Sequence, residues 1–451
     1  MGSDHRDWPE LSIGDLLSRG VIQLHKDGNH GSAYPRANEF GTEGIPFLTA
    51  KLVDDAGKID IAAAPRLPDE RANQLRFGFV LSDDVLLSHN ATVGRVAIVP
   101  KYLGKLLVGT SLTCFRLDKA QLLPQYLAAF FRGKYFQNQL SAVMGLSTRS
   151  QVPVTTQRSL RVVVPPMSAQ SSIASMLGAL DDRIDNLRQT NATLEAIAQA
   201  LFKSWFVDFD PVRAKAEGHE PECMDAATAA LFPSEFEDSE LGPIPKGWRA
   251  GTSDELLDLV GGGTPKTSVD EYWDGDIPWF SVVDAPASGQ VFTLDTTKKI
   301  TGSGLKNCSA KLLPPMTTII SARGTVGKVA MTGVPMAMNQ SCYALRPKIE
   351  GGEAFVYFST LRFVEQLQRI AHGAVFDTIT RESFKRIMAC LPSEQTIFGF
   401  ALTVNPLLER IRINGIQAAN LATLRDTLLP RLISGRLRLP EAAALVEEAT
   451  P

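Results

Sequence analysis

The amino-acid sequence predicts an α+β protein with an internal pseudo-twofold duplication, in which two similar α/β domains are separated by two long helices that form a coiled-coil spacer. Three observations lead to this prediction. A unit of roughly 225–240 residues occurs twice, each copy begins with a strand-rich part, and each copy ends with a helical part. The chain of 451 residues is long enough for two or three domains with cores of their own.

The duplication is most evident in a short phrase that occurs twice, as TVGRVA at 92–97 and as TVGKVA at 325–330. Other matches follow in the same order in both copies: Trp8 with Trp248, 44–47 with 276–279, 86–88 with 319–321, and 182–184 with 409–411. A repeat of this length far exceeds the repeats of solenoid proteins. It indicates two copies of one unit that comprises a domain and its helix.

The first part of each copy has the character of short strands joined by turns. Runs of β-branched and aromatic residues are interrupted by Gly, Pro and Asn, which are typical of turns. The clearest of these runs are 93–99, 161–164, 317–321 and 329–332. We therefore expect a small, irregular, strand-rich domain at the start of each copy.

The second part of each copy has mainly apolar residues at alternating spacings of four and three. This 3.5-residue period predicts a coiled-coil seam rather than a general helix face. In the first copy the seam is Leu180, Ile184, Leu187, Asn191, Leu194, Ala198, Leu201 and Trp205. In the second copy it is Leu407, Ile411, Asn414, Ala418, Leu421, Arg425, Leu428 and Leu432. Asn191 and Asn414 would favour one register of the pair at some cost in stability.

Both helices are expected to start at a break in the pattern. Gly178 marks this break in the first copy, while Asn405 as N-cap and Pro406 as first helical residue mark it in the second. Each helix would then have about 26 residues and a length of about 39 Å. An alternative is that each helix packs only on its own domain. A paired spacer is favoured, because neither seam can remain exposed.

These patterns divide the chain into six segments. We predict a first domain at 1–166, a central spacer helix region at 167–207, an acidic connector at 208–245, a second domain at 246–392, a C-terminal spacer helix region at 393–437 and a tail at 438–451.

The charge distribution is compatible with a nucleic-acid partner. The formal net charge is only −3, but residues 1–165 carry +4 and residues 246–392 carry +2, whereas residues 166–245 between them carry −9. Two mildly basic blocks thus flank an acidic middle, which permits DNA binding without requiring it.

The composition predicts a soluble cytoplasmic protein that has no membrane association. The sequence contains no apolar run of the roughly 18–20 residues that a membrane span needs, and its polar N-terminus differs from a signal peptide. The five cysteines are scattered without a C-x-x-C pair, which argues against disulfides or a zinc site.

The usual catalytic motifs are absent from the sequence. The segment RGTVGKV at 323–329 resembles a phosphate-binding loop, but Ala322 replaces its first glycine and Val329 replaces its hydroxyl residue. The six histidines have no metal-ligand spacing. We therefore expect a chain without catalytic residues, metal or cofactor of its own.

Polar residues on glycine-flanked loops are candidates for contacts with DNA. Arg and Lys suit guanine and phosphate, and Asn suits adenine. The candidates are Asn29, His30, Tyr34, Arg36, Lys51, Asn90, Arg149, Thr264, Lys266, Arg323 and His372. For any one of them the alternative is an ordinary solvated loop residue. Phe47 and Trp279, which both follow Ile-Pro, are expected in the core.

Several phrases resemble the DNA-specificity subunit of type I restriction–modification systems, and the resemblance extends from Trp8 to about Leu437. They are GGTP and YWDGDIPW within 262–279, ISARGTVGKVA at 320–330, LFKSWFVDFDPV at 201–212, SELGPIPKGW at 239–248 and LLPRLISGRL at 428–437. The first copy departs from the usual pattern, since DGNHGSAYPR at 27–36 replaces GGTP, and Asn90 stands where the second copy has Arg323.

The resemblance implies two target-recognition domains joined by two antiparallel helices, each domain reading one half of a split, asymmetric site in double-stranded DNA. A spacer of about 39 Å would cover roughly 11–12 base pairs, which is close to one turn of duplex. Catalysis is then expected from partners: two methyltransferase (M) subunits, which bind S-adenosylmethionine and methylate adenine, and ATP- and Mg²⁺-dependent translocase–nuclease (R) subunits. Two alternatives are a specificity subunit of a fused methylating and cutting system, and a scaffold that does not bind DNA.

Overall fold

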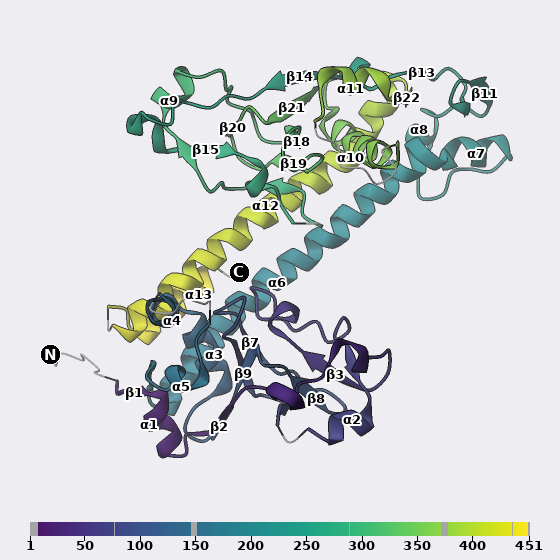
Figure 1. Cartoon of the computed structure of the whole chain (residues 1–451). Helices are drawn as coiled ribbons and strands as arrows, with labels where there is room; N and C mark the ends of the chain where they lie inside the picture. The colour runs from purple at the N-terminus through teal and green to yellow at the C-terminus, as the bar shows by residue number, and fades with distance from the viewer. Residues whose placement is uncertain are drawn as a thin grey trace. The chain divides into compact units, whose positions relative to one another are not determined.

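The computed structural model describes residues 8–75, 77–145, 151–287, 289–370, 378–434 and 436–449. The chain divides into two compact units, one formed by Met1–Ile184 with Asn420–Pro451 and the other by Asp185–Ala419. Two long helices, α6 (Met167–Lys203) and α12 (Glu394–Ile433), each begin in one unit and end in the other (Figure 1).

The first unit is organised around a four-stranded antiparallel sheet with the strand order β2-β9-β6-β7. Its strands are β2 (Ile22–Lys26), β6 (Val85–Ser88), β7 (Val96–Ile98) and β9 (Leu112–Leu117). The central strands β6 and β9 read as nearly continuous apolar runs because they are buried along almost their whole length. Helix α3 (Pro124–Arg132) packs against β6 and β7.

A second sheet of the first unit has the order β4-β3-β8-β5, in which β3 and β8 pair in parallel. Its strands are β3 (Ile45–Leu48), β4 (Arg66–Leu67), β5 (Phe79–Val80) and β8 (Leu106–Val108). The remaining elements are β1 (Glu10–Ser12), which pairs with β10 (Arg161–Val163), and the helices α1 (Ile13–Ser18), α2 (Asp69–Asn73), α4 (Lys134–Met144), α5 (Val154–Gln157) and α13 (Leu439–Ala449). Three short 3-10 turns are Gly31–Ala33, Ala37–Glu39 and Ala50–Leu52.

The second unit repeats this plan with a five-stranded sheet of order β14-β21-β18-β19-β16 and a three-stranded sheet of order β17-β15-β20. The strands of the larger sheet are β14 (Leu257–Gly261), β16 (Phe292–Thr293), β18 (Thr318–Ser321), β19 (Val329–Thr332) and β21 (Cys342–Pro347). Those of the smaller sheet are β15 (Trp273–Phe280), β17 (Lys299–Ile300) and β20 (Ala337–Met338). Two antiparallel pairs complete the set, β11 (Phe236–Ser239) with β12 (Gly242–Pro245), and β13 (Arg249–Thr252) with β22 (Met388–Leu391).

The helices of the second unit outside the long pair include one of 18 residues, α10 (Glu353–Ile370). The others are α7 (Asp210–Ala216), α8 (Ala226–Ala229), α9 (Gly302–Lys306) and α11 (Arg381–Arg386). A π-helical turn, Ser204–Asp208, follows α6 directly, and 3-10 turns occur at Ser253–Glu255, Asp270–Tyr272 and Val282–Asp284. No helix in the described part of the chain combines the length and the apolar composition that a membrane crossing requires.

The repeated phrase forms the same hairpin turn in both units, which confirms the duplication. The Ser88 hydroxyl accepts a hydrogen bond from the Arg95 amide at 2.8 Å, and the Ser321 hydroxyl accepts one from the Lys328 amide at 2.8 Å. The glycine of each phrase has a positive φ, 101° at Gly94 and 84° at Gly327, which other residues adopt only with strain. Both copies of the turn need a serine hydroxyl that accepts this amide and a glycine with positive φ, which explains why the phrase is repeated.

The parallel pairing of the smaller sheets is also duplicated. Phe47 pairs with Leu107 in the first unit, and Trp279 pairs with Ala337 in the second. Phe47 is 2% exposed and Trp279 is 7% exposed, so both are core residues as the sequence predicts. The structure thus confirms the predicted α+β class and the two similar strand-rich domains.

The two long helices start earlier than the sequence predicts. Gly178 and Pro406 both lie inside continuous helices, so the expected breaks were wrong. The helices contain 37 and 40 residues instead of about 26. A glycine inside a helix costs only about 1 kcal/mol and a proline about 3 kcal/mol.

Tertiary contacts beside the expected breaks offset these costs. Val404 and Leu408, on either side of Pro406, are fully buried, and the Asn405 side chain donates a hydrogen bond to the Gly351 carbonyl at 3.1 Å. The first turn of α12 is instead capped by Ser393, whose hydroxyl accepts a hydrogen bond from the Thr396 amide at 3.1 Å.

The predicted seam residues lie in the interior of their units. Leu180, Ile184, Leu421 and Leu428 are buried in the first unit, as are Leu187, Ile411 and Asn414 in the second. Asn191, Leu194, Leu201 and Leu407 are half-buried, and beside Leu407 it is Leu408 that is fully buried. Within the second unit the two helical segments run antiparallel, because Asn191 meets Asn414 while Phe202 meets Phe400.

Two asparagines form a polar contact on the helix seam of the second unit. The Asn414 amide donates to Oδ1 of Asn191 at 2.9 Å, and the Asn191 amide donates to the Ile411 carbonyl at 3.1 Å. Oδ1 of Asn414 is buried without a partner among the described residues. This arrangement specifies one register at a cost in stability.

We expect Asn191→Ala to destabilise the helix pair by about 1–3 kcal/mol, because it leaves the buried Asn414 amide unsatisfied. The double variant Asn191→Leu, Asn414→Leu should be at least as stable as the natural pair, since it removes both buried polar groups. Hydrogen–deuterium exchange over 187–201 measures both effects. A double variant less protected than Asn191→Ala would contradict this account.

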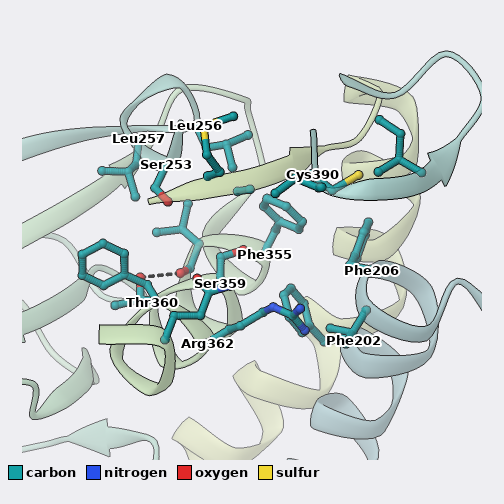
Figure 2. A pocket seen from close by; sticks show the side chains of 18 of the residues that line it. Phe202, Phe206, Ser253, Leu256, Leu257, Phe355, Ser359, Thr360, Arg362 and Cys390 are labelled. Atoms are coloured by element: carbon teal, nitrogen blue, oxygen red, sulfur yellow. Dashed lines mark hydrogen bonds between the residues drawn. The ribbon is translucent and has the colours of Figure 1, made fainter. Parts of the chain in front are cut away.

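Aromatic side chains gather where α6 ends in the second unit. Trp205 lies edge-on to Phe232 with ring centroids 5.0 Å apart, and Phe206 lies edge-on to Phe355 at 4.9 Å. A hollow of about 260 Å³ opens beside them, and Figure 2 shows its lining from α6, α10 and β22. This cluster is the core that the phrase LFKSWFVDFDPV at 201–212 supplies.

Candidate nucleic-acid interface

In the second unit, four polar loops meet at one edge of the paired sheets. The Thr264 hydroxyl donates a hydrogen bond to the side-chain oxygen of Gln340. The Ala322 amide donates to the Ser341 carbonyl at 2.8 Å, and its carbonyl accepts from the Ile379 amide at 2.8 Å. The loops that begin at Gly262, Ala322, Asn339 and Thr378 are thereby joined.

The equivalent edge of the first unit is built by the same backbone bonds. The His89 amide donates to the Ser111 carbonyl at 3.0 Å, and the His89 carbonyl accepts from the Val152 amide at 2.8 Å. Asn90 forms a bridge with Gln151, just as Arg323 forms one with Thr378 in the second unit. The two domains therefore share one loop framework and differ in the side chains that it carries.

A hollow of about 370 Å³ lies at this edge of the first unit. Its lining is mainly polar: Asp27, His30, His89, Asn90, Thr110, Gln151, Pro153, Val154 and Thr155. Such side chains offer hydrogen-bond donors and acceptors of the kind that read base edges.

One glycine in each domain lets the first loop reach this edge. A Cβ on Gly28 would lie 2.3 Å from the Val108 carbonyl oxygen, and a Cβ on Gly262 would lie 2.0 Å from the Asn339 carbonyl oxygen. Both positions touch the chain where the parallel strand, β8 or β20, ends. Gly28 is therefore the counterpart of Gly262, although the surrounding sequences DGNHGSAYPR and GGTP differ.

Most candidates from the sequence analysis lie on the surface. His30, Arg36, Lys51, Thr264, Lys266 and Arg323 are exposed, Tyr34 is 37% exposed beside Phe47, and Asn90 is half-buried. The structure brings His30 and Asn90 together at the hollow of the first unit. It also joins the loops of Thr264 and Arg323 in the second unit.

Asn29 has a structural role instead. It is 6% exposed, and its side-chain amide donates a hydrogen bond to the Phe77 carbonyl at 2.7 Å. An amide engaged in this way cannot offer that donor to a base. Arg149 and His372 lie outside the described residues.

The sequence analysis missed Asp27 and His89, which line the hollow of the first unit, and four further residues of the edge. Thr110 and Gln340 follow the ends of β8 and β20, and Gln151 and Thr378 bridge to Asn90 and Arg323. The first pair could have been found by aligning the repeat, because each residue directly precedes the serine of that edge, Ser111 or Ser341.

The electrostatics of the edge differ between the units. In the first unit, burial lowers the pKa of His89, and the nearby Asp27 carboxylate opposes this effect. His30 donates a hydrogen bond to Oδ2 of Asp27 at 2.7 Å. In the second unit the corresponding loops carry the exposed cations Lys266 and Arg323. No group of three His, Cys, Asp or Glu within the described ranges could hold a metal ion.

Comparisons with known proteins agree with this duplicated architecture. The Haemophilus influenzae type I restriction enzyme HindI specificity subunit is 29% identical, over 96% of this chain and 100% of that protein. The type I restriction enzyme MjaIX specificity subunit of Methanocaldococcus jannaschii is 25% identical, over 96% of this chain and 97% of that protein. The crystal structure of a type I restriction–modification S subunit from M. genitalium has a TM-score of 0.55 at 14% identity, covering 95% of this chain and 96% of that chain, and supports the fold.

The family model of the type I restriction modification DNA specificity domain matches residues 41–196 and 245–399, which together make up more than half of the chain. The two matches fall on the two copies of the repeat, and each contains most of the loops that form its candidate edge. The chain therefore belongs to the type I restriction–modification DNA specificity family and carries two DNA specificity domains.

Proposed function

We propose that this chain is the DNA-recognition subunit of a type I restriction–modification complex and reads a bipartite, asymmetric site in double-stranded DNA. One observation carries the proposal: the same loop edge is built twice with different side chains. Asn90 and Gln151 stand on one framework where Arg323 and Thr378 stand on the other. A shared framework with different polar groups suits two domains that dock alike and read different sequences.

The side chains at each edge suggest which of them contact bases and which contact phosphates. Arg323 suits a bidentate contact with guanine, whereas Asn90 and Gln151 suit adenine. The exposed Lys51 and Lys266 suit phosphates, which position the protein without selecting a sequence. Lys51 follows Ala50, whose amide donates to the Ser111 hydroxyl of the edge at 2.9 Å.

The chain would act without catalytic residues or a cofactor of its own. Two methyltransferase (M) subunits would bind S-adenosylmethionine and methylate adenine at the selected site. Translocase–nuclease (R) subunits would use ATP and Mg²⁺ to move along DNA and cut it. The predicted segments at 1–166 and 246–392 would be the two target-recognition domains, with 167–207 and 393–437 as spacer regions and 208–245 as connector.

A methylation map tests the proposal. We expect N6-methyladenine in a host that expresses this chain with its neighbouring M subunit to lie in a split, asymmetric motif with a fixed gap. The motif should disappear when this gene alone is deleted. Replacing residues 1–166 with the corresponding domain of a relative should change one half of the motif and leave the other half unchanged.

Other outcomes would favour the alternatives. An unchanged methylation map in a host with a demonstrably active system would contradict DNA recognition and favour a scaffold. A split motif produced by one fused methylating and cutting partner would favour that arrangement over separate M and R subunits. Copurification of the tagged chain identifies which partner set is present.

A further inference from the structure

The first unit contains a hydrogen-bonded network of buried polar side chains, called the polar chain below, that leads from its core to the candidate edge. His25, Thr113, Gln157 and His89 are all between 0% and 5% exposed. Nε2 of His25 lies 3.1 Å from Oε1 of Gln157, and Nδ1 of His89 lies 2.8 Å from the Thr113 hydroxyl. The chain ends at Asp27, whose Oδ2 lies 3.7 Å from Nε2 of His89.

The donors along this chain point in one direction. The Gln157 amide donates to the Val152 carbonyl at 2.9 Å and to the Thr113 hydroxyl at 2.9 Å, so its oxygen must be the atom that faces His25. A Thr113 hydroxyl that donates to Nδ1 of His89 continues this direction. In that arrangement the His89 proton lies on Nε2, which faces the carboxylate of Asp27.

Both histidines of this hydrogen-bonded network lie in surroundings that disfavour their charged form. Burial lowers the pKa of His25 and that of His89, and Nδ1 of His25 has no partner among the described residues. With its proton on Nε2, His89 would present an N–H toward Oδ2 of Asp27.

The second unit has apolar or aromatic residues at the positions that correspond to this chain. The strand registers align His25 with Leu259 and Thr113 with Tyr343. The shared loop bonds and the spacing along the repeat align His89 with Ala322 and Gln157 with Phe384. Leu259, Tyr343, Ala322 and Phe384 belong to one hydrophobic cluster. The fold therefore does not need the polar chain, and burying polar groups without a use for them is costly.

The buried polar network can offset its cost in stability if it positions the carboxylate of Asp27. Its side chain is 18% exposed and lines the hollow together with Asn90 and Gln151. Oδ2 is held by His30 and faces His89, whereas Oδ1 accepts no hydrogen bond from any described residue. A carboxylate beside DNA is repelled by phosphates and by the acceptor atoms of guanine and thymine. It is favoured only where it meets a donor.

We propose that Asp27 is a specificity-determining residue of the first domain, whose free carboxylate oxygen accepts a hydrogen bond from an exocyclic amino group of a base in the major groove. In the major groove, the amino groups that can donate such a hydrogen bond are N4 of cytosine and N6 of adenine. The buried chain through His89 acts as a positioning device that orients the carboxylate. This inference rests on the proposed function, because it assumes that the edge faces DNA.

The test uses the assembled complex with its methyltransferase partner and a pool of DNA substrates that are degenerate at each position of the motif. The wild-type complex should prefer cytosine or adenine at one position of the half-site read by the first domain, and the motif shows which of the two. Asp27→Asn should reduce that preference by roughly tenfold or more. Preferences at the other positions, including the second half-site, should be unchanged.

A matched control removes the same charge elsewhere in the domain. Glu70→Gln on the surface helix α2 should leave every preference unchanged, because Glu70 is exposed and remote in sequence from the hollow's loops. An effect of Asp27→Asn that Glu70→Gln reproduces would overturn the inference, since overall charge alone would explain it.

The positioning role has its own variant. Thr113→Val keeps the shape of a fully buried side chain but removes the hydroxyl between Gln157 and His89. It should weaken selectivity at the Asp27 position alone, whereas a purely structural role would lower methylation of all substrates alike and would overturn the positioning role.

Different results would overturn the role of Asp27 and the proposed function. A folded Asp27→Asn complex with wild-type selectivity at every position would overturn the inference and leave the proposed function intact. A wild-type complex without a bipartite motif would overturn both.

Discussion

Replacing Gly262 with alanine is expected to destabilise the second domain by about 3 kcal/mol or more. The new Cβ would lie 2.0 Å from the Asn339 carbonyl oxygen and 2.6 Å from that of Met338, and both are backbone atoms. Neither can rotate away as a side chain could, so β20 must shift relative to β15. Because Asn339 begins the loop of Gln340, the shift should also weaken recognition by this domain.

Gly261→Ala is the matched control, since a Cβ at that position would meet no described atom within 4 Å. Thermal unfolding and hydrogen–deuterium exchange over β15 and β20 measure the difference between the two variants. Equal stability of the two would show that the loop does not need close contact with β20. In the assembled complex, Gly262→Ala should impair the half-site of the second domain and spare that of the first.

The second large effect is expected for Trp205→Ala, at about 3–5 kcal/mol. Trp205 is 4% exposed, and its ring packs edge-on against Phe232 at 5.0 Å and Phe400 at 5.6 Å. Removing it leaves a cavity where α6, the 208–245 segment and α12 meet within the second unit. The surrounding aromatic rings are held by several partners each and can fill that space only in part.

Ile197→Ala serves as control on α6, which leads directly into the turn of Trp205. Ile197 is 45% exposed, so its truncation should change stability by less than about 0.5 kcal/mol. Chemical unfolding of both variants gives the comparison. It is monitored by circular dichroism of the backbone, because that signal does not depend on a tryptophan. A loss from Trp205→Ala no larger than that from Ile197→Ala would contradict the assignment of this cluster as a core.

Much of the fold could be predicted from the sequence because it depends on local patterns that occur twice. The turn around Gly94 and Gly327 is encoded within a few residues, and the same six-residue phrase therefore marks it in both copies. The apolar period of Leu180, Ile184 and Leu187 likewise indicates that these residues are buried, even when the segment that packs against them is not known. These features need only backbone geometry and the hydrophobic effect.

The sequence alone misplaced the starts of the long helices and could not assign the loops. Propensity marks Gly178 and Pro406 as breaks, but buried neighbours such as Val404 and Leu408 outweigh that preference. The sequence also does not separate Asn29, whose amide is engaged inside the fold, from Asn90 at the hollow. That difference depends on a contact with Phe77, which lies 48 positions away.

The sequence by itself determined that the chain is a duplication of a strand-rich domain with a long helix. Only the tertiary structure decided which polar residues share an edge and which support it from within. Thr264 and Gln340 meet although they are 76 positions apart, and His25 reaches Gln157 across 132 positions. Local periodicity is written in neighbouring residues, whereas a recognition surface is assembled from loops that only the paired strands bring together.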